Sequence, residues 1–331
     1  MLLNPKSAGY QFFWKSLFFV LVAFGLGLLY YATKEVDYVW RWYRVPQYFV
    51  AETEVEIRAY IEGEVAGIER DGETVRIAVA GLDGDTETYS APADGVRVSR
   101  GDLISPGDVL ASYSETRPGI LLQGLWLTLK VSVISIVFGI LIGLFGGLAR
   151  VSQNPCFRWL AIVYIEFIRG SPLLVQIYLW YFVFGTIINN LFSRMGIPPV
   201  SSLWYGVVSL AIFAGAYVAE IVRAGIQSIH RGQTEAARSL GMTYVQAMSH
   251  VVLPQAMRRI LPPLAGQFIS LIKDSSLLGI IAIRELTKAT REVVTTSLQP
   301  YELWFVCALL YLVLTFSLSL FVQYLERRTL V

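Results

Sequence analysis

Long apolar runs recur along the chain, and polar segments of varying length separate them. A helix needs about 20 apolar residues to cross a hydrocarbon core of about 30 Å, and each run comes close to that length or exceeds it. Lys273 and Asp274 interrupt the fifth run. We therefore predict an all-α polytopic membrane protein with about six transmembrane helices. The expected spans cover residues 11–31, 120–148, 160–188, 204–224, 264–283 and 303–325.

The segment between the first two runs has a different pattern. It contains no long apolar run, and short stretches alternate between apolar and polar residues, which is typical of strands. The expected strands cover residues 55–59, 74–79 and 96–98, with turn signals at 71–72, 83–84, 94–95 and 106–108. Residues 46–118 are therefore predicted to form a small all-β insert, between an N-terminal membrane anchor at 1–45 and a five-span core at 119–331.

Two stretches of this insert, 91–96 and 100–111, resemble the barrel-sandwich fold of lipoyl and biotinyl domains. The same fold occurs in membrane-fusion adaptor proteins. Carrier versions of the fold need a modified lysine, and residues 46–119 contain no lysine. A swinging cofactor arm is thereby excluded. Two interpretations stay open: a passive extracytoplasmic spacer, or a module that docks a substrate-binding protein or another envelope partner.

Composition supports lipid as the solvent for most of the chain. Of the 331 residues, 55% are hydrophobic and 16% are charged, whereas a soluble domain carries about a quarter charged residues. The formal net charge of +2 is unevenly distributed. Residues 46–119 hold 15 acidic and 6 basic side chains, and the rest of the chain holds 10 acidic and 21 basic ones. The acidic insert and the basic remainder are expected to face different compartments.

Basic residues in short loops set the orientation of a membrane protein, because they stay in the cytoplasm. The loop after the third span carries only Arg194. The loop after the fifth span carries Arg284, Lys288 and Arg291, and these basic residues run against the predicted orientation. Glu285 and Glu292 offset part of that charge. We predict cytoplasmic termini and an extracytoplasmic insert, in the cell inner membrane. The residues that indicate the cytoplasmic side are Arg150, Arg158, Arg231, Arg238, Arg258, Arg259, Arg327 and Arg328.

The first apolar run could be a cleaved signal or a retained anchor. Lys6 and Lys15 precede its apolar centre, which fits a signal peptide. The run is long, however, no clear A-x-A site follows, and aromatic and basic residues at 38–44 are typical of an anchor at the membrane interface. We expect the anchor to be retained.

The cytoplasmic loop after the fourth span contains a helix-favouring stretch that begins with Glu235, Ala236 and Ala237. Gly241 is a natural stop after its last turn, and Pro254 is expected to limit a second helical stretch. The small alanines allow a partner surface to approach closely. An ordinary amphipathic loop helix is the alternative interpretation.

The spacing of this loop is E-A-A, three residues, Gly, nine residues, an aliphatic residue, any residue, Leu and Pro. It resembles the EAA loop of importer permeases in the ABC transporter superfamily. The resemblance implies a helix, within residues 233–254, that seats in a groove of a separate ATPase, with Glu235 and Arg238 able to pair across the contact. The coupling residues are then Glu235, Ala236, Ala237, Arg238, Gly241, Leu253 and Pro254.

The chain contains no Gly-Lys pair, so it lacks a Walker A phosphate loop. ATP and magnesium are therefore expected on the partner ATPase, and no catalytic residue or cofactor is expected on this chain. His230 and His250 lie far apart without clustered ligands, so no metal site is predicted. Cys156 and Cys307 both lie outside the insert, which therefore cannot hold an internal disulfide.

Three further stretches resemble the polar amino-acid permeases of that superfamily, of the histidine and glutamine type. They cover residues 164–176, 216–226 and 271–277, and the resemblance as a whole extends over 119–328. The first span and the insert lie outside it. Ser275 stands where the family has Thr, and Gly266 stands where it has Asn.

Charged residues at membrane depth are costly and usually face protein or water. Glu220 with Arg223, and Glu166 with Arg169, are spaced to pair as neighbours on one helix, either as structural clamps at the cytoplasmic mouth or as substrate contacts. Lys273 and Asp274 point to different sides of a helix, so each needs its own partner, on another helix or on a substrate. The candidate path or gate residues are Arg169, Pro172, Gln176, Glu220, Arg223, Lys273, Asp274 and Ser275.

Two features of the spans concern helix packing. Pro172 removes a backbone hydrogen bond from an apolar helix, and this favours either a gate or a static kink. Gly139, Gly143 and Gly147 form a small face at four-residue spacing, which lets helices approach closely. We interpret the glycine face as a packing surface.

The resemblance implies the permease subunit of an ABC importer for polar amino acids. Two identical or paralogous permeases would surround one path, bind two ATPase subunits, and receive solute from an extracytoplasmic binding protein. No nucleic acid is expected as a partner. The alternatives are a permease for another solute, such as an organic cation or an opine, and a non-transporting envelope scaffold or signalling subunit. A membrane-embedded enzyme ranks third.

Overall fold

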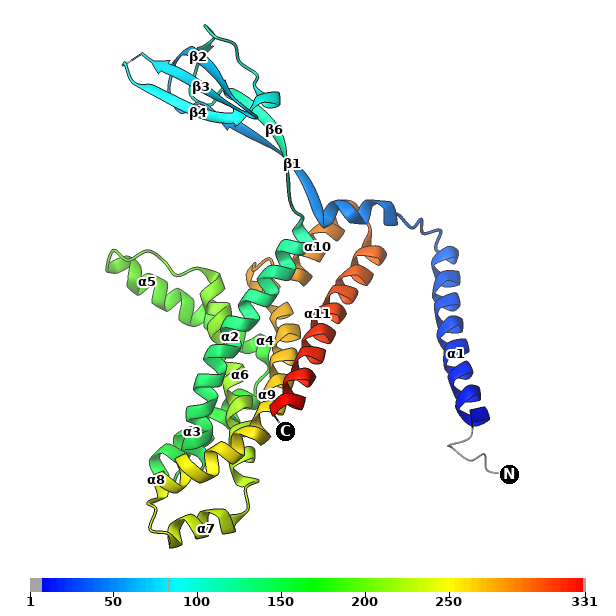
Figure 1. The fold of residues 1–331 in the computed structure, drawn as a ribbon, viewed down its shortest axis with the longest axis vertical. Coiled ribbons are helices and arrows are strands. Elements are labelled where there is room, and N and C mark those ends of the chain that lie inside the picture. Colours follow the sequence, from blue (N-terminus) through cyan, green and yellow to red (C-terminus); the bar gives the residue numbers. More distant parts are fainter. Residues whose placement is uncertain (1–7, 83, 330–331) are drawn as a thin grey trace. The chain divides into compact units, whose positions relative to one another are not determined.

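The computed structural model describes residues 8–82 and 84–329, with side chains described through Tyr324 (Figure 1). Lys6, Asp83 and the side chains of Arg327 and Arg328, which entered the sequence predictions, lie outside the described residues. Six of the described helical segments are long and apolar enough to cross a membrane, as predicted. They are Ala8–Glu35, Ile120–Arg150, Leu173–Arg194, Ser202–Gln227, Tyr244–Ile281 and Pro300–Tyr324.

The N-terminal unit ends at Arg44 and contains the helix α1, Ala8–Glu35. Aromatic residues gather where the helix ends. The ring of Trp40 stacks on that of Trp42 at 5.5 Å between centroids, and its indole N–H donates to Thr33 Oγ1 at 3.3 Å. A cluster of amphipathic rings after an apolar helix is typical of the membrane interface.

The insert is an all-β module of two sheets. A two-stranded antiparallel ribbon, β1 with β6, leads into a four-stranded antiparallel sheet in the order β4-β3-β2-β5. The strands are β1 Val50–Arg58, β2 Gly63–Asp71, β3 Thr74–Gly81, β4 Thr86–Pro92, β5 Leu103–Ile104 and β6 Val109–Pro118. The alternating residues Val75, Ile77 and Val79 point into its core, where Val65 and Leu110 are fully buried.

The predicted strands at 55–59 and 74–79 fall largely within β1 and β3, but the one at 96–98 is wrong. Only Val96 pairs, in an isolated bridge to Ala111. A short 3₁₀ helix, η2 Ala93–Gly95, precedes it. A Cβ on Gly95 would lie 2.4 Å from the Ser112 carbonyl oxygen, so glycine is required for this close approach.

The base of the ribbon is held against the helices. The N–H of Gly119 donates to the Phe49 carbonyl at 2.7 Å, immediately before α2, Ile120–Arg150. Val45, which lies in the 3₁₀ helix η1 Trp42–Tyr48, packs in one apolar cluster with Leu121, Leu286 and Leu303. These leucines belong to α2, α10 Leu286–Ser297 and α11 Pro300–Thr329.

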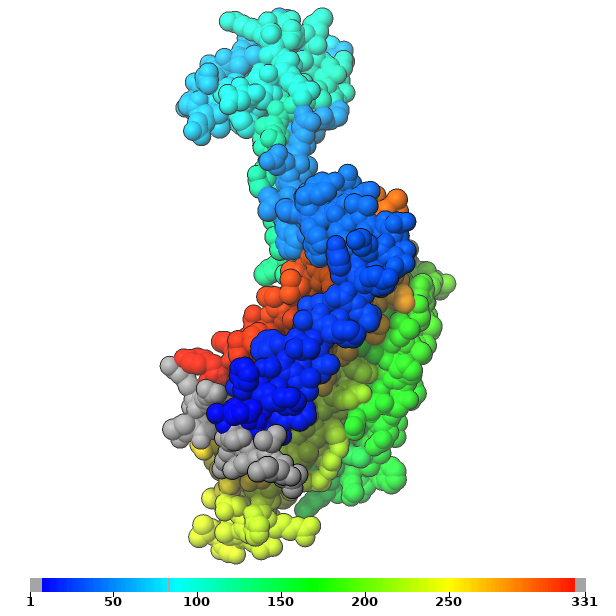
Figure 2. Space-filling model, turned by 90° about the vertical axis from the view of Figure 1, so that its right-hand side faces the viewer, coloured from blue at the N-terminus to red at the C-terminus, as the bar shows by residue number. Residues whose placement is uncertain are grey.

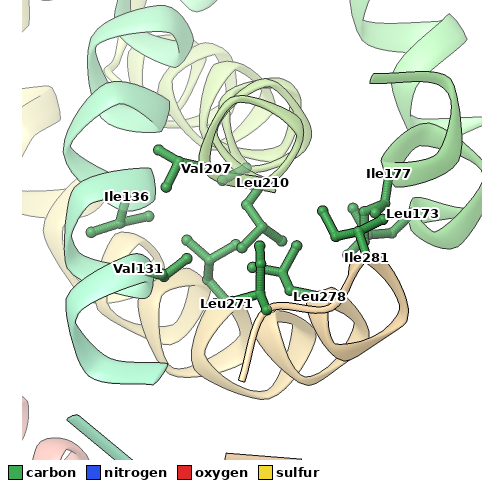
Figure 3. Packing of buried hydrophobic residues seen from close by; sticks show 11 residues of the cluster. Val131, Ile136, Leu173, Ile177, Val207, Leu210, Leu271, Leu278 and Ile281 are labelled. Carbon is green, nitrogen blue, oxygen red and sulfur yellow. The ribbon is translucent and has the colours of Figure 1, made fainter. Parts of the chain in front are cut away.

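The core of the helical region forms where α2 packs along α6, Ser202–Gln227. The predicted glycine face makes this contact. A Cβ would lie 2.4 Å from the Val218 side chain if added to Gly143, and 2.6 Å from Val222 if added to Gly147. Beside this interface, Val131, Leu210 and Leu271 from three helices meet in the apolar cluster shown in Figure 3.

The third span is broken, which corrects the prediction of a continuous helix over 160–188. The first piece, α3 Pro155–Arg169, ends before Gly170. The span itself is Leu173–Arg194, made of α4 Leu173–Tyr178, the π-helical η3 Leu179–Gly185 and α5 Thr186–Arg194. Pro172 caps α4 with an extended backbone, φ −63° and ψ 137°. It separates two helices instead of kinking one, because its ring cannot continue the hydrogen-bond ladder.

The fifth span begins about 20 residues earlier than predicted. One helical run leads from α8 Tyr244–Ala247 through the π-helical η4 Met248–Val252 and α9 Leu253–Asp274 into the 3₁₀ turn η5 Ser275–Ile281. Pro254 does not limit a helix, which corrects that prediction. It lies in the first turn of α9, directly after the π-turns, where the ladder has shifted and no N–H is needed.

Candidate functional site

A short amphipathic helix, α7 Arg231–Ser239, connects α6 to α8 and carries the Glu-Ala-Ala sequence. It protrudes at one end of the helical core and is yellow-green in Figure 2. His230 begins the helix, because its Nδ1 accepts a hydrogen bond from the Gly232 N–H at 3.1 Å. The first of the two histidines therefore has a capping role.

Gly241 ends α7, as predicted. Its φ is +84°, a left-handed conformation that costs glycine little. Its N–H donates to the Arg238 carbonyl at 3.0 Å, and the Met242 N–H donates to that of Ala237 at 3.2 Å. This pair of bonds satisfies the last carbonyls of the helix in a Schellman motif.

The next helix, α8, starts at once with a capping box between Thr243 and Gln246. The turn between α7 and α8 is therefore fixed by backbone and side-chain hydrogen bonds on both sides. A fixed turn holds α7 in a defined direction relative to the fifth span.

The outer face of α7 mixes charge with small and apolar side chains. Glu235, Ala236 and Arg238 are exposed, whereas Ala237 is buried at 4% exposure and faces its own chain. The close approach expected of both alanines is thus available only at Ala236. Leu240 is 82% exposed and Val245 is 72% exposed, and together they add an apolar surface to the charged one. Neither residue was predicted as part of the contact, although both lie within the spacing of the motif.

The two remaining residues of the predicted motif lie in the first turn of α9. Leu253 is partly buried against the cluster of Val222, Ile226 and Ile260, and Pro254 is exposed. Leu253 therefore fixes the base of the α7–α8 segment to α6 and α9.

Among the predicted charge pairs, Glu220 with Arg223 is formed. Arg223 Nε donates to Glu220 Oε2 at 2.9 Å, and its other nitrogens reach Glu220 Oε1 and Gln227. The predicted ion pair between Glu166 and Arg169 is not formed among the described residues. Glu166 instead faces Arg150 of α2 at 3.4 Å between Oε1 and Nη2, which ties α3 to α2.

Arg169 lies over the ring of Tyr217, with its guanidinium carbon 5.3 Å from the ring centroid. Both residues line a groove of about 470 Å³ between α3, α6 and α9. We call it the arginine groove. Glu220 and Arg259 also line it, and Arg259 Nη1 donates to the Ser228 carbonyl at 2.5 Å. Tyr217 and Arg259 were not predicted as site residues, because their distance in sequence gives no sign that they meet.

The other path candidates lie elsewhere. Gln176 is buried at 3% exposure and its Nε2 donates to the Ile168 carbonyl at 2.8 Å, across the break between α3 and α4. Ser275 is fully buried and donates to the Ile272 carbonyl at 2.7 Å. Lys273 is exposed and Asp274 partly buried. The interhelical ion pairs expected of Lys273 and Asp274 are not formed among the residues that the structure describes.

In the loop after the fifth span, whose basic residues run against the predicted orientation, two of the three basic side chains are paired with one carboxylate. Arg284 and Lys288 both face Glu292, at 2.8 and 3.8 Å. Glu285 caps α10 instead, because its carboxylate accepts the N–H groups of Thr287 and Lys288. Burial raises the pKa of Glu285, and these hydrogen bonds act in the opposite direction. Within residues 8–82 and 84–329, no group of three metal-ligating side chains is assembled.

Comparison with known protein families gives a match over residues 135–331. The family is described as binding-protein-dependent transport system inner membrane component. The match begins within α2 and therefore covers the glycine face, the arginine groove and α7.

Curated relatives match the same part of the chain. A probable glutamine ABC transporter permease protein, GlnM, of Bacillus subtilis (strain 168) is 39% identical over 62% of this chain and 92% of its own length. The glutamine transport system permease protein GlnP of Escherichia coli (strain K12) is 39% identical over 63% of this chain and 92% of its own. The L-cystine transport system permease protein TcyB of Bacillus subtilis (strain 168) is 37% identical over 63% of this chain and 86% of its own length.

Solved structures show the same fold. An amino acid ABC transporter crystallised with histidines is 39% identical, has a TM-score of 0.55, and covers 63% of this chain and 94% of its own. The MetNI methionine ABC transporter in an inward-facing conformation is 22% identical, with a TM-score of 0.54. The likeness covers 63% of this chain and 95% of the chain in that structure. The second likeness is one of fold alone.

Proposed function

Since the chain belongs to the family of binding-protein-dependent transport system inner membrane components, we propose that it is the permease subunit of an ABC importer for polar amino acids such as glutamine. The observation that carries the proposal is α7. It has a fixed turn, an exposed charged and apolar outer face, and the motif spacing of a subunit that couples to an ATPase. The relatives that match over most of their length are named for glutamine and L-cystine transport.

The outer face of α7 seats on a separate ATPase subunit, which binds ATP and magnesium. Leu240 and Val245 supply apolar area for this contact, and Glu235 and Arg238 supply directional charge. Exposed apolar side chains of this kind gain stability when a partner removes them from water. The capped turns on both sides of Gly241 make α7 a rigid connection, so a displacement of the ATPase moves the fifth span.

The path for the solute runs beside the charged faces of α3, α6 and α9, between two permease subunits that are identical or paralogous. An extracytoplasmic binding protein delivers the solute. Glu220 and Arg223 compensate each other at membrane depth, which lowers the cost of keeping both charges there. Lys273 and Asp274 are free to face the second subunit or the solute.

The termini and α7 lie in the cytoplasm, and the β module lies outside the cell inner membrane. The basic residues of the loops between the second and third spans and between the fourth and fifth spans support this orientation. In the outer loop after the fifth span, Arg284 and Lys288 are both paired with Glu292. The acidic β module docks the binding protein near the mouth of the path. A passive spacer is the second interpretation of the module.

The experiment is ATP-dependent uptake of labelled glutamine into proteoliposomes. These contain the chain, its ATPase and its binding protein, together with a second permease if one copurifies. Uptake that unlabelled amino acids compete for supports the proposal and ranks the cargo. Uptake of organic cations or opines but of no amino acid moves the assignment to another solute. Assembly and ATP hydrolysis that no solute stimulates, with no uptake, favours an envelope scaffold or signalling subunit.

A further inference from the structure

The β module gathers three large, exposed apolar side chains at one end. Tyr60, Leu82 and Leu103 are 80%, 78% and 83% exposed, and we call this group the apolar tip. The Leu82 N–H donates to the Glu62 carbonyl at 3.3 Å, and Tyr60 lies two residues before Glu62. Leu103 pairs with Glu64 of the same strand. A group of exposed apolar side chains, unlike a single one, indicates a contact with another molecule.

The apolar tip lies at the end of the module that is farther along the ribbon from the first helix of the core. The strand β1 begins at Val50 and ends directly before the loop that carries Tyr60, and its nine residues extend over about 27 Å. The other end of the four-stranded sheet meets the ribbon part-way along, where Gly95 lies against the Ser112 carbonyl. The tip is therefore separated by most of the ribbon from Gly119, after which α2 begins.

Hydrogen bonds fix the loops of the apolar tip. The Ala59 N–H donates to the Asp108 carbonyl at 2.9 Å, and the Gly107 N–H donates to the Ala59 carbonyl at 2.8 Å. These two bonds tie the loop after β1 to the loop before β6. The Tyr60 N–H donates to the Tyr89 hydroxyl at 2.9 Å. A surface that is already ordered loses little conformational entropy when a partner binds it.

Carboxylates surround the apolar tip. Glu62, Glu64 and Asp85 are exposed and form no ion pair among the residues that the structure describes. Of the arginines near this end, Arg58 is already paired within the module, and Arg100 lines a shallow hollow together with Glu64. An apolar centre with a charged rim is the usual anatomy of a protein–protein interface.

The sign of the rim selects the occupant. Two modules brought tip to tip would place carboxylates against carboxylates, and like charges juxtaposed across an interface are strongly unfavourable. Anionic lipid headgroups are disfavoured for the same reason, since they attract basic segments and not acidic ones. The complementary partner is a protein with an apolar surface that lysine and arginine surround, on the same side of the membrane as the module.

We propose that the apolar tip docks the extracytoplasmic binding protein through a basic-rimmed apolar surface of that protein. The inference rests on the proposed function and deepens it, because it assigns the docking contact to three side chains and gives the charge of the partner's face. A globular partner of about 230 residues has a radius of gyration of about 17 Å. A ribbon of about 27 Å therefore reaches the side of such a partner when it rests on the helical core.

This contact is an addition to the shared importer core. The family match begins at residue 135, after the module has ended. The core itself can still contact the binding protein at the mouth of the path. The tip then adds a second point of attachment, which raises the effective concentration of the binding protein at the mouth.

The test is equilibrium binding of the labelled binding protein that supports uptake in proteoliposomes, measured on the full permease–ATPase complex in nanodiscs. Leu82→Ser and Leu103→Ser should each weaken binding about ten-fold or more, because a leucine is lost from the buried contact. Val50→Ser is the matched control and should bind as the wild type does, since Val50 is exposed at the opposite end of β1. All three side chains are exposed, so the unfolding temperature of the complex should not change.

The rim is tested by charge reversal. Glu62→Lys should slow association several-fold at low salt, and added salt should reduce the difference from the wild type, because rim charges act mainly on the encounter rate. Glu73→Lys changes the net charge equally at the other end of the sheet, where the Glu73 carbonyl accepts the Ala93 N–H, and it should associate as the wild type does. Faster association of Glu62→Lys would overturn the basic face assigned to the partner.

Other occupants of the tip give different results. Phosphatidylglycerol vesicles that bind the wild type but not Leu103→Ser, while both bind the binding protein equally, would overturn the proposal in favour of a lipid contact. Concentration-dependent association of two complexes that only Leu103→Ser abolishes, again with equal binding of the binding protein, would overturn it in favour of a second copy.

The proposal and the proposed function fail in different ways. If the complex imports glutamine and the tip variants bind the binding protein as tightly as the wild type does, the tip is not the docking surface, but the importer assignment stands. If the complex imports another solute with its own binding protein, the cargo changes and the same variants test the tip against that protein. Absence of uptake of any solute by the wild type removes the importer assignment and the docking role together.

Discussion

The α2–α6 interface and the α7 segment place small residues in opposite situations. At the interface, Gly143 and Gly147 lie so close to α6 that an added Cβ would meet a valine side chain at 2.4 to 2.6 Å. On α7, Ala236 is exposed, and Leu240 at the C-cap of the helix is 82% exposed. The first region is completed by contacts within the chain, whereas the second presents a surface that the chain itself does not cover. Substitutions should therefore separate folding from assembly.

Reversing a charge on the outer face of α7 should have the largest effect on assembly. Glu235→Arg places a cation where the proposed ATPase contact holds an anion, and like charges juxtaposed across an interface are strongly unfavourable. We expect the ATPase to be lost on co-purification, while membrane insertion and the thermal unfolding of the isolated chain stay unchanged, because Glu235 is exposed. Normal recovery of the ATPase with this variant would remove the docking assignment.

Adding one methyl group at the α2–α6 interface should have the opposite result. Gly143→Ala forces a Cβ to within 2.4 Å of Val218 and 2.8 Å of the Gly215 carbonyl. Such overpacking costs about 1–3 kcal/mol, and it should lower the thermal unfolding temperature of the chain in detergent.

The matched control for that change is Gly266→Ala in α9. Among the described residues, no atom beyond the neighbouring residues and the local helix backbone lies within 4 Å of a Cβ built on Gly266, and alanine favours a helix over glycine by about 0.5–1 kcal/mol. This variant should be as stable as the wild type or slightly more so. Equal losses at both glycines would mean that the packing of α2 on α6 is not what Gly143 contributes.

Sequence reasoning identified both regions because their signals are local or periodic. The glycine face repeats every four residues, and Gly241 follows a helix-favouring stretch at the distance that a helix stop requires. Neither conclusion needs knowledge of which segments meet. The motif positions of α7 were likewise available from spacing alone.

The same reasoning failed where a local signal has two physical outcomes. A proline in an apolar run can kink a helix, end it or begin it, and the surrounding ladder decides among these. At Pro172 the helices separate, whereas at Pro254 a π-turn lets the helix continue. Arg169 was expected to pair with Glu166 three residues away, but it stacks on Tyr217 of another helix. Only the packing of α3 on α6 creates that alternative, and no spacing in the sequence records it.

Removing apolar area from α7 should weaken the assembly by a moderate amount. Leu240→Ser exchanges a side chain that is 82% exposed in the isolated chain for a polar one, so stability of the chain should not fall. If the ATPase buries Leu240, the lost transfer free energy is about 1.5–3 kcal/mol, which corresponds to about a ten-fold to hundred-fold weaker affinity. Titration of the purified ATPase onto the permease measures it, with Leu312→Ser, at an exposed lipid-depth position of α11, as a control for general loss of apolar surface. An unchanged affinity for Leu240→Ser would leave the contact to the charged residues.

The ion pair between Glu166 and Arg150 should have the smallest effect, although it joins the end of α2 to α3 beside the glycine face. Its atoms are 3.4 Å apart, and the Glu166 side chain is 65% exposed. Exposed pairs of this kind contribute about 0–1 kcal/mol, because water and salt screen them. Arg150 is more buried, at 21% exposure, and its Nη1 is buried without a hydrogen-bond partner among the described residues. Glu166→Gln therefore affects only the contact of Nη2, and the amide oxygen of glutamine can still accept a hydrogen bond from it. The unfolding temperature of Glu166→Gln should therefore stay close to that of the wild type, and much closer than that of Gly143→Ala. A loss as large as the glycine variant's would show that charge, and not the fit of small residues against α6, holds this end of the helical core together.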